Sequence, residues 1–311
     1  MEYKNLKSLK AKVSKIGLGC VTFGREIDKK QSLTILDRAF DNGINLLNTS
    51  YYYSNGDSEK ILGNFFQTRK NRKKFIIISK IHGDLSSSTI ENCINDSLKR
   101  MQTDYIDFYG ITYDQNSRLD SILETMEKFQ KQGKILKVAC NNYDYNLLTS
   151  SKKIQKDRGY STFGMMETVY NILYRGVENQ LIDYSNKEEI DIITYSPLGA
   201  GFITGKYKNG MASPNKTRFD IKPAHKDIYF KEKFFETMNK MNSLSKETNI
   251  SLVDLALSWV ISRKFITSVL IGVRELSHID RPIYLLENKI DKVILNKIDA
   301  ITRNNLNLIN P

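Results

Sequence analysis

The chain has 311 residues, of which 40% are hydrophobic and 26% are charged. It can therefore bury a substantial core, and it belongs to neither the disordered nor the fibrous class of protein. Its 47 Lys and Arg residues outnumber its 35 Asp and Glu residues, which gives a net charge of +12. Such a charge suits a nucleic acid, a membrane surface or a phosphate-bearing small ligand. Because Lys is abundant throughout the sequence, we interpret most of the charge as solvated surface.

The cysteines and histidines predict neither a disulfide framework nor a metal site. Cys20, Cys93 and Cys140 lie far apart without CxxC spacing, and the three histidines include no HxxxH pair. This cysteine usage is typical of a reducing compartment. The basic N-terminus has no apolar signal-peptide core, and no later run approaches the roughly 18 apolar residues of a membrane span. We therefore expect a cytoplasmic protein without a bound metal or a membrane partner.

Short apolar segments rich in β-branched residues alternate with stretches of helical periodicity along the chain. The predicted strands span residues 16–23, 45–50, 75–80, 105–112, 137–141, 165–169, 191–196 and 268–273. The predicted helices span residues 30–42, 58–68, 88–101, 119–132, 145–156, 177–189 and 252–262. Since no Pro/Gly/Ser-rich linker interrupts this alternation, it predicts an α/β fold with one (β/α)8 TIM barrel over residues 1–311.

The alternation of side chains within the predicted strands supports the barrel. Ile76, Ile78 and Lys80 share one face of their strand, as the inward-pointing layers of a barrel require. The polar residues Asn48, Lys80 and Thr112 stand at the carboxyl ends of their strands, where barrel enzymes place their chemistry. We therefore expect these three side chains at one rim.

Three segments lie outside the repeat. The first 15 residues are predicted to form a small hairpin that closes the barrel floor. Residues 201–226 form a long polar loop containing Gly, Lys and Pro, and loops of this length are usually functional lids or disordered. Residues 287–306 are predicted to form a C-terminal amphipathic helix.

The glycine-rich residues 199–206 (GAGFITGK) narrowly miss two phosphate-binding signatures. The dinucleotide fingerprint needs Gly in place of Thr204, and the P-loop needs Gly in place of Ala200 and Ser or Thr in place of Tyr207. What remains is a flexible loop whose backbone amides and Lys206 could approach a pyrophosphate, or else an ordinary turn.

Tyr53 and Lys80 form a candidate acid-base pair once the strands are placed. A tyrosine has an unperturbed pKa near ~10 and donates a proton efficiently at neutral pH only beside a cation or within a hydrogen-bond chain. Lys80 could supply that cation. Taken singly, both residues are also compatible with purely structural roles.

Five segments, in chain order, resemble the aldo-keto reductases. They are residues 14–20 (SKIGLGC), 43–53 (GINLLNTSYYY), 58–63 (SEKILG), 97–107 (SLKRMQTDYID) and 195–201 (YSPLGAG). The resemblance spans nearly the whole chain. It implies a (β/α)8 barrel that binds NADPH, less often NADH, and reduces carbonyl groups of sugars, aldehydes or ketones.

The resemblance also implies a catalytic group of Asp, Tyr, Lys and His. Tyr53 matches the general-acid tyrosine and Lys80 the lysine that assists it, whereas Asn48 replaces the Asp and Thr112 replaces the His. The tetrad would then be degenerate. We expect Lys80 to have lost its charge partner, and an unpaired, desolvated ammonium tends to deprotonate.

Substrate contacts follow from the same matching. Thr112 can donate one hydrogen bond to a substrate oxygen but cannot relay a proton as His can. His82, two residues beyond Lys80, could substitute or could be a rim residue without a catalytic role. Tyr51, Tyr52 and Tyr113 would surround the pocket mouth, where aromatic faces suit a sugar or an aromatic ring, unless they pack under the loop.

For the cofactor, the resemblance implies a nicotinamide pocket and a phosphate region. Asn141, Asn142 and Glu167 would hold the carboxamide, and Tyr195 would stack on the ring. The residues matched to the pyrophosphate region are Ser196, Leu198, Gly201 and Lys206. Arg274 is the candidate for a 2′-phosphate, while His278 and Pro282 depart from the family pattern. We predict NADP as cofactor, with NAD as the alternative, and residues 201–226 as a loop that covers it.

The sequence thus predicts an NAD(P)-dependent oxidoreductase acting on a carbonyl or hydroxyl of a small substrate, with a sugar or sugar derivative as one candidate. A non-redox acid-base enzyme on the same barrel is an alternative that would also retain Tyr53 and Lys80. A nicotinamide-binding pseudoenzyme, acting as a sensor or scaffold, is favoured by Asn48 and Thr112. No basic stripe interleaved with aromatic residues indicates nucleic-acid binding, and no feature indicates an oligomeric state.

Overall fold

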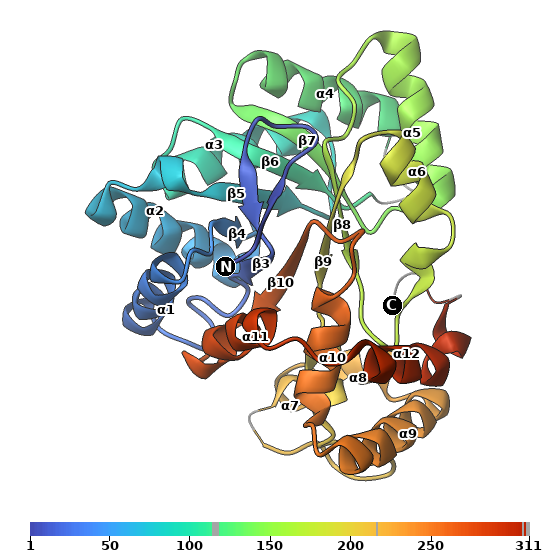
Figure 1. Ribbon diagram of the computed structural model, residues 1–311. Coiled ribbons are helices and arrows are strands. Elements are labelled where there is room, and N and C mark those ends of the chain that lie inside the picture. Colours follow the sequence, from blue (N-terminus) through green and yellow to red (C-terminus); the bar gives the residue numbers. More distant parts are fainter. Residues whose placement is uncertain (114–117, 216, 307, 309–311) are drawn as a thin grey trace.

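The computed structural model of the protein describes residues 1–113, 118–215, 217–306 and 308. Within them, parallel strands close into an eight-stranded barrel in the order β10-β3-β4-β5-β6-β7-β8-β9 (Figure 1), which confirms the predicted TIM barrel. The strands, in chain order, are β3 (Ile16–Gly19), β4 (Leu46–Asn48), β5 (Ile76–Ile81), β6 (Ile106–Ile111), β7 (Ile135–Asn141), β8 (Met165–Val169), β9 (Asp191–Tyr195) and β10 (Ser268–Gly272).

Helices surround the barrel and connect its strands (Figure 1). Those that follow β3 to β8 are α1 (Lys29–Asp41), α2 (Asp57–Arg69), α3 (Ser87–Met101), α4 (Leu119–Lys131), α5 (Tyr145–Arg158) and α6 (Leu181–Lys187). Those that follow β9 are α7 (Arg218–Ile221), α8 (Lys226–Tyr229), α9 (Glu232–Thr248) and α10 (Leu252–Ile261). The chain then forms β10, α11 (Ser277–Glu287) and α12 (Lys292–Ile301).

Side-chain caps fix where several helices begin. The carboxylate of Asp28 accepts the backbone N–H of Gln31 at the start of α1, and the hydroxyl of Ser86 accepts that of Thr89 at the start of α3. Such a cap contributes about 1 kcal/mol to helix stability. Buried residues then recur every three or four positions along α3, so that one face of this helix packs against the barrel.

The core has two layers. Inside the barrel, alternate strand residues such as Ile76, Ile78 and Phe108 form one buried cluster, which confirms the predicted inward face of β5. A larger cluster fills the space between the strands and the surrounding helices. The inner cluster also contains Leu6 and Val13, which flank or belong to the antiparallel hairpin of β1 (Tyr3–Asn5) and β2 (Lys12–Ser14). The hairpin therefore closes one end of the barrel, as predicted.

Three predicted segments differ from the observed elements by more than two residues at one end or both. The strand predicted over residues 16–23 ends at Gly19, because the backbone turns so that Phe23 N–H reaches the carbonyl of Cys20. The helix predicted over residues 177–189 is a 3-10 turn followed by α6, with a break at Asn179, whose ψ of −95° is not helical. The helix predicted over residues 287–306 is shorter, because α11 ends at Glu287 and α12 spans only residues 292–301.

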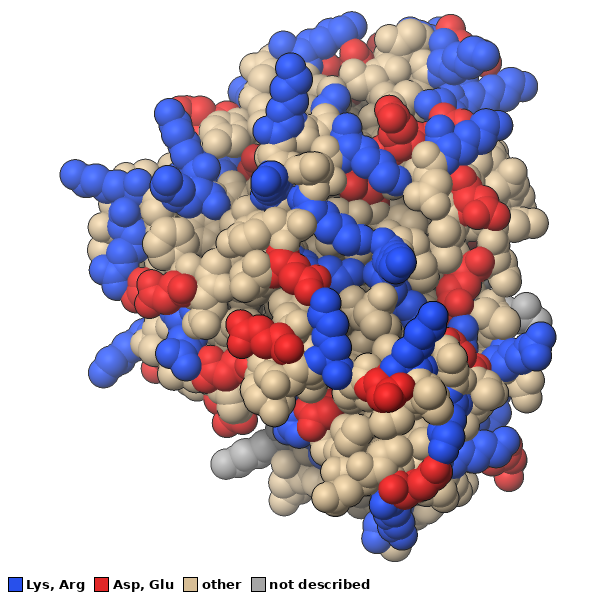
Figure 2. All heavy atoms as spheres, in the orientation of Figure 1, with Lys and Arg blue, Asp and Glu red and all other residues tan. Residues whose placement is uncertain are grey.

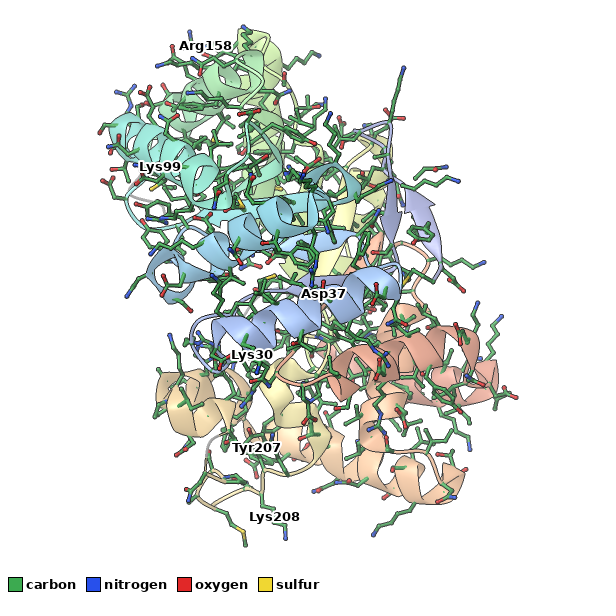
Figure 3. All side chains as sticks on the ribbon, turned by 90° about the vertical axis from the view of Figure 1, so that its left-hand side faces the viewer. Lys30, Asp37, Lys99, Arg158, Tyr207 and Lys208 are labelled. Atoms are coloured by element: carbon green, nitrogen blue, oxygen red, sulfur yellow. The ribbon has the colours of Figure 1, made fainter. Side chains whose placement is uncertain are left out.

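The segment after β9 holds more structure than the sequence predicted. A 3-10 segment, η4 (Gly199–Thr204), opens it. Within the predicted loop 201–226 lie α7, the 3-10 turn η5 (Pro223–His225) and the first residue of α8, while residue 216 lies outside the described residues. Neither α9 nor α11 was predicted. Figure 3 places Lys208 of this segment at one extremity of the molecule and Arg158, at the end of α5, at the other.

Charge is widely distributed on the surface. Figure 2 shows Lys and Arg side chains over most of the visible face, interspersed with Asp and Glu, as expected of solvated charge. The cysteines Cys20, Cys93 and Cys140 are all buried thiols. Among the described residues, no helix is both long and apolar enough to cross a membrane.

Candidate active site

Polar side chains gather inside the barrel near the carboxyl ends of its strands. Asn48 ends β4, Lys80 is the penultimate residue of β5, Asn141 ends β7, and Glu167 lies opposite Asn141 in the register of β8. Gly110 on β6 makes room for Lys80, because a Cβ at this position would lie 3.2 Å from the Cβ of Lys80. The fold thus brings together side chains from strands that are far apart in the sequence.

Lys80, Asn48 and Glu167 form a closed triangle of hydrogen bonds. Lys80 Nζ donates to Asn48 Oδ1 at 2.9 Å and to Glu167 Oε1 at 2.6 Å. Asn48 Nδ2 donates to the second carboxylate oxygen, Glu167 Oε2, at 2.8 Å. The side chains of Lys80 and Glu167 are only 9% and 5% exposed, so this ion pair is buried.

The expectation that Lys80 has lost its charge partner is therefore wrong. Burial lowers the pKa of Lys80, but the carboxylate of Glu167, followed by Tyr53 and Tyr195, outweighs it and leaves the pKa above its usual value. From the sequence, a carboxylate partner for Lys80 was expected only at position 48. The structure shows that one arrives from β8, on another side of the barrel, and Lys80 therefore remains an ammonium ion at neutral pH.

Tyr53 lies in a tight turn after β4 that several neighbours hold in place. It opens the 3-10 segment η1 (Tyr53–Gly56), in which Ser54 and Asn55 have φ angles of 51° and 52°. Ser54 Oγ donates to the carbonyl of Phe23 at 2.7 Å. Gly56 has a φ of 89°, and a Cβ there would lie 2.6 Å from the guanidinium of Arg100, so glycine is required by both conformation and space.

Arg100 connects this turn to the buried carboxylate of Glu59. Its guanidinium donates to the carbonyl of Tyr51 at 3.1 Å and to Glu59 Oε2 at 3.3 Å. Glu59 Oε1 accepts a hydrogen bond of 2.8 Å from Ser79, the neighbour of Lys80. The backbone around Tyr53 is thereby held against β5. As a result, Lys80 Nζ lies 5.6 Å from the centre of the Tyr53 ring.

Thr112 and Asn141 meet beside this pair. Asn141 Nδ2 donates to Thr112 Oγ1 at 2.6 Å, whereas the buried Asn141 Oδ1 has no hydrogen-bond partner among the described residues. Because the Thr112 oxygen already accepts a hydrogen bond, its own hydrogen remains available to another acceptor. Both residues line the same cavity as Tyr53 and Lys80.

Tyr195, Asn142 and Ser196 form the next part of the site. Tyr195 O–H donates to Asn142 Oδ1 at 3.0 Å, and burial raises the pKa of Tyr195 to about 12, so that it stays a neutral phenol. Asn142 and Ser196 have φ angles of 58° and 54°, in the left-handed region. Tyr195 and Ser196 line the cavity, whereas Asn142 lies behind Tyr195 as its hydrogen-bond acceptor.

One cavity of about 1170 Å³ extends from these residues to the ends of β9 and β10. This volume exceeds the usual range for a small-molecule pocket, which is about 300–1,000 Å³. The remaining predicted cofactor residues line it, namely Leu198, Gly201, Lys206, Arg274 and His278. So does Gly272, where a Cβ would meet nothing within 4 Å.

Cations crowd the far end of this cavity. Burial and, after it, the charge of Arg274 lower the pKa of Lys206. The pKa of Arg218 is lowered first by burial, next by the charge of Arg25, and also by the charge of Arg274. His278, whose pKa falls mainly through burial, experiences the same positive field from Arg274 and Lys206. Mutual repulsion of this kind favours a bound anion.

The sequence did not predict Arg218 or Glu26 as site residues, although both line the cavity. Arg218 begins α7, and its Nη1 lies 3.5 Å from Glu26 Oε1 in the segment before α1. Arg25 pairs with the same carboxylate at 2.6 Å. No local motif marks these residues. Their meeting depends on how the segment after β9 folds over the barrel rim.

The predicted substrate residues are divided between the cavity and its surroundings. His82 lines the cavity, packs 4.5 Å from the ring of Tyr52, and has a pKa lowered by burial and by Lys80. Tyr51, Tyr52 and Tyr113 lie outside the cavity lining. Tyr51 instead stacks on Arg100 at 4.3 Å and donates to Asp96, while Tyr113 packs on Tyr143.

The chemistry of the cavity fits a nicotinamide dinucleotide. At the end beside Tyr53, the unpartnered Asn141 Oδ1 could accept a hydrogen bond from a carboxamide. At the other end, Lys206, Arg218 and Arg274 supply charge for phosphate groups, and the open space at Gly272 lets a ligand approach the backbone. Among the described residues, no group of His, Cys, Asp and Glu side chains could hold a metal ion.

The chain is similar to known proteins over nearly its whole length. Residues 15–303 match the model of the aldo/keto reductase family. The uncharacterized oxidoreductase YrpG of Bacillus subtilis (strain 168) is 26% identical over 322 residues, which cover 97% of this chain and 96% of the relative. Protein tas of Escherichia coli (strain K12) is 25% identical over 339 residues, which cover 97% of each chain. As its sequence segments predicted, the chain belongs to the aldo/keto reductase family of oxidoreductases.

Proposed function

We propose that the protein is an NADP-dependent oxidoreductase that interconverts a carbonyl and a hydroxyl group of a small substrate, with NAD as the alternative cofactor. The observation that carries the proposal is the single cavity that joins a tyrosine and lysine pair to a cluster of cations. The two ends would suit a dinucleotide, with Tyr53 beside its reactive ring and Lys206 and Arg274 holding its phosphates.

In this proposal, the bound cofactor supplies or accepts the hydride. The protein supplies the proton, because Tyr53 O–H would donate to the developing alkoxide as the carbonyl carbon is reduced. Lys80, held as an ammonium ion by Glu167, favours negative charge on the phenol oxygen when the proton leaves. Thr112 O–H would donate a second hydrogen bond to the same substrate oxygen. In the reverse direction, Tyr53 would take up the proton.

In this proposal, each of the four predicted catalytic positions has a role, and the tetrad is not simply reduced to half. Tyr53 is the acid, Lys80 the neighbouring cation, and Thr112 a neutral donor in place of a cationic one. Asn48 does not contact the substrate in this scheme, since both of its polar atoms are bound to Lys80 and Glu167. Retention of the charged Lys80 favours an enzyme over a pseudoenzyme that only binds the cofactor.

Residues 201–226 are the proposed cover of the cofactor. The segment contributes Gly201, Lys206 and Arg218 to the cavity lining. Arg218 pairs at 3.5 Å with Glu26, which comes from the segment before α1 and also lines the cavity. A ligand in the cavity beneath this contact would be enclosed, and its release would require the ion pair to open.

The cofactor assignment is tested by titrating the purified protein with NADPH and with NADH while the fluorescence of the cofactor is recorded. We expect micromolar binding of NADPH and weaker binding of NADH. A Lys208→Ala variant is the control, because Lys208 is exposed and lies outside the cavity lining. If neither cofactor binds at millimolar concentration, the hydride-transfer function is excluded.

A further inference from the structure

Glu167 is placed to do more than line the cavity. Its two carboxylate oxygens have separate partners, since Oε1 accepts from Lys80 at 2.6 Å and Oε2 accepts from Asn48 at 2.8 Å. The Glu167 side chain is only 5% exposed. A carboxylate this deeply buried is stable only when a cation or several donors compensate it, and here one of each does so.

Among the residues that the structure describes, no carboxylate other than Glu167 forms an ion pair with Lys80. Glu26 pairs with Arg25 and Arg218, and Glu275 contacts the imidazole of His278 and accepts a hydrogen bond from Ser277. Asp254 and Asp280 are engaged by Arg281 and Arg38 in the same way. The titratable groups that face Lys80 are Glu167 from β8, Tyr53 from η1, Tyr195 from β9, His82 from its own strand end, and the thiol of Cys20.

Asn48 completes the arrangement through the direction of its amide. Its oxygen faces the ammonium of Lys80 and its nitrogen faces the carboxylate of Glu167, so a flipped amide would oppose donor to donor and acceptor to acceptor. The contact between positions 48 and 167 therefore accommodates one carboxylate and one amide. Two carboxylates at 2.8 Å would repel each other or share a proton.

We infer that Glu167 is the positioning residue that keeps Lys80 charged beside Tyr53, and that positions 48 and 167 can exchange carboxylate and amide without loss of this role. An Asp at position 48 would accept from Lys80 where Asn48 Oδ1 does so now. A Gln at position 167 would then donate to that Asp and accept from Lys80. The exchanged pair preserves the net charge and every hydrogen bond of the triangle.

The inference rests on the proposed function only where it concerns turnover, so its first test uses the protein without cofactor or substrate. Trace acetic anhydride acetylates a neutral amine but not an ammonium ion. Labelling of Lys80, relative to the exposed Lys208, is measured at pH 8 by proteolysis and mass spectrometry. The proteins compared are the wild type, Glu167→Gln, Asn48→Ala, and the double variant Asn48→Asp with Glu167→Gln.

In Glu167→Gln, the relative labelling of Lys80 should rise by about 100-fold, because the buried ammonium loses the carboxylate of Glu167. The double variant should label as slowly as the wild type. Asn48→Ala, which opens space next to Lys80 but retains Glu167, is the control for reagent access. An equal rise in Asn48→Ala and Glu167→Gln, or fast labelling of the double variant, would overturn the inference.

The second test uses turnover of whichever carbonyl substrate the enzyme accepts. Glu167→Gln should lower kcat by about 100-fold, and the double variant should recover most of the loss, with the pH profile of the wild type. If the double variant folds like the wild type but does not recover kcat, the inference is contradicted. Absence of turnover in the wild type would instead contradict the proposed function, and the labelling result would still decide the role of Glu167.

Discussion

The amide nitrogen of Asn141, at the end of β7, donates a hydrogen bond of 2.6 Å to the hydroxyl oxygen of Thr112. Thr112 directly follows the neighbouring strand β6. This contact orients Thr112, because an oxygen that accepts from Asn141 presents its hydrogen to a different acceptor. The only acceptor that the proposed reaction brings to this place is the substrate oxygen. In the proposed function, Thr112 would therefore act as a neutral hydrogen-bond donor to the substrate.

Replacing Thr112 by Val should reduce kcat/KM by about 10- to 100-fold. The change keeps the shape of the side chain but removes the donor and leaves the Asn141 amide without its acceptor, at a cost of about 1–3 kcal/mol. Thr112→Ser is the matched control and should retain most of the activity. Steady-state kinetics on both variants would contradict the assignment if Val and Ser gave the same kcat/KM as the wild type.

Most of the fold could be predicted from the sequence, because it follows from local patterns. Buried parallel strands such as β5 (IIISKI) are short apolar runs, and Lys80 stands out in that run as an inward polar residue. Helix α9 was missed, although Phe234, Met238 and Met241 recur in it at helical spacing. The segment inserted after β9 interrupts the regular strand-helix repeat. Because the prediction assumed one helix between each pair of strands, it omitted α9.

The site was predicted less completely, for a different physical reason. Strand alternation shows which residues point inward, but it does not show which side chains meet across the barrel. Lys80 and Glu167 are 87 positions apart, and their contact is set by strand order and side-chain length. One signal could have revealed the pair, since a Glu at an inward position of a buried strand requires a cation.

Arg274 should determine the preference between the two cofactors. If its guanidinium holds the 2′-phosphate, Arg274→Ala should weaken NADPH binding by about 10- to 100-fold, because charge-assisted hydrogen bonds contribute about 1.5–3 kcal/mol. The dissociation constant for NADH should change little. Fluorescence titration with both cofactors distinguishes the possibilities, and equal weakening of NADPH and NADH would show that Arg274 does not recognise the 2′-phosphate.

Lys15 should make the folding stability depend on pH. The residue is 4% exposed, and its amine donates to the carbonyls of Arg263 and Ile266. Burial, and next the charge of Lys4, lowers the pKa of Lys15 from 10.5 to about 7. Between these pH values the unfolded chain retains a proton that the folded protein has released, so the folded state gains stability as the pH rises.

The free energy of unfolding of the wild type, relative to Lys15→Met, should therefore increase by about 2 kcal/mol between pH 7 and pH 9, given a slope of at most ~1.4 kcal/mol per pH unit. Urea unfolding at several pH values measures the difference. A difference that stays constant or falls as the pH rises would be incompatible with a neutral Lys15 in the folded state.

Gly63 should be required for the packing of α2 on α3. A Cβ at this position would contact the carbonyl oxygen of Arg100 and lie 2.9 Å from the carbonyl carbon of Met101, both of which are backbone atoms that cannot rotate away. Gly63→Ala should lower the free energy of unfolding by about 2 kcal/mol, despite the better helix propensity of Ala. Gly272→Ala is the control for stability, since its Cβ meets nothing within 4 Å.

The central claim is that Tyr53 transfers the proton that accompanies hydride transfer. The most direct measurement compares the wild type with Tyr53→Phe in two respects. One is the rate of NADPH oxidation in the presence of a panel of aldehydes and reducing sugars, and the other is the affinity for NADPH. Loss of a positioned acid should lower kcat by about 10²- to 10⁴-fold, whereas NADPH affinity should stay within about threefold of the wild type. A Tyr53→Phe protein that turns over the same substrate at the wild-type rate would contradict the account.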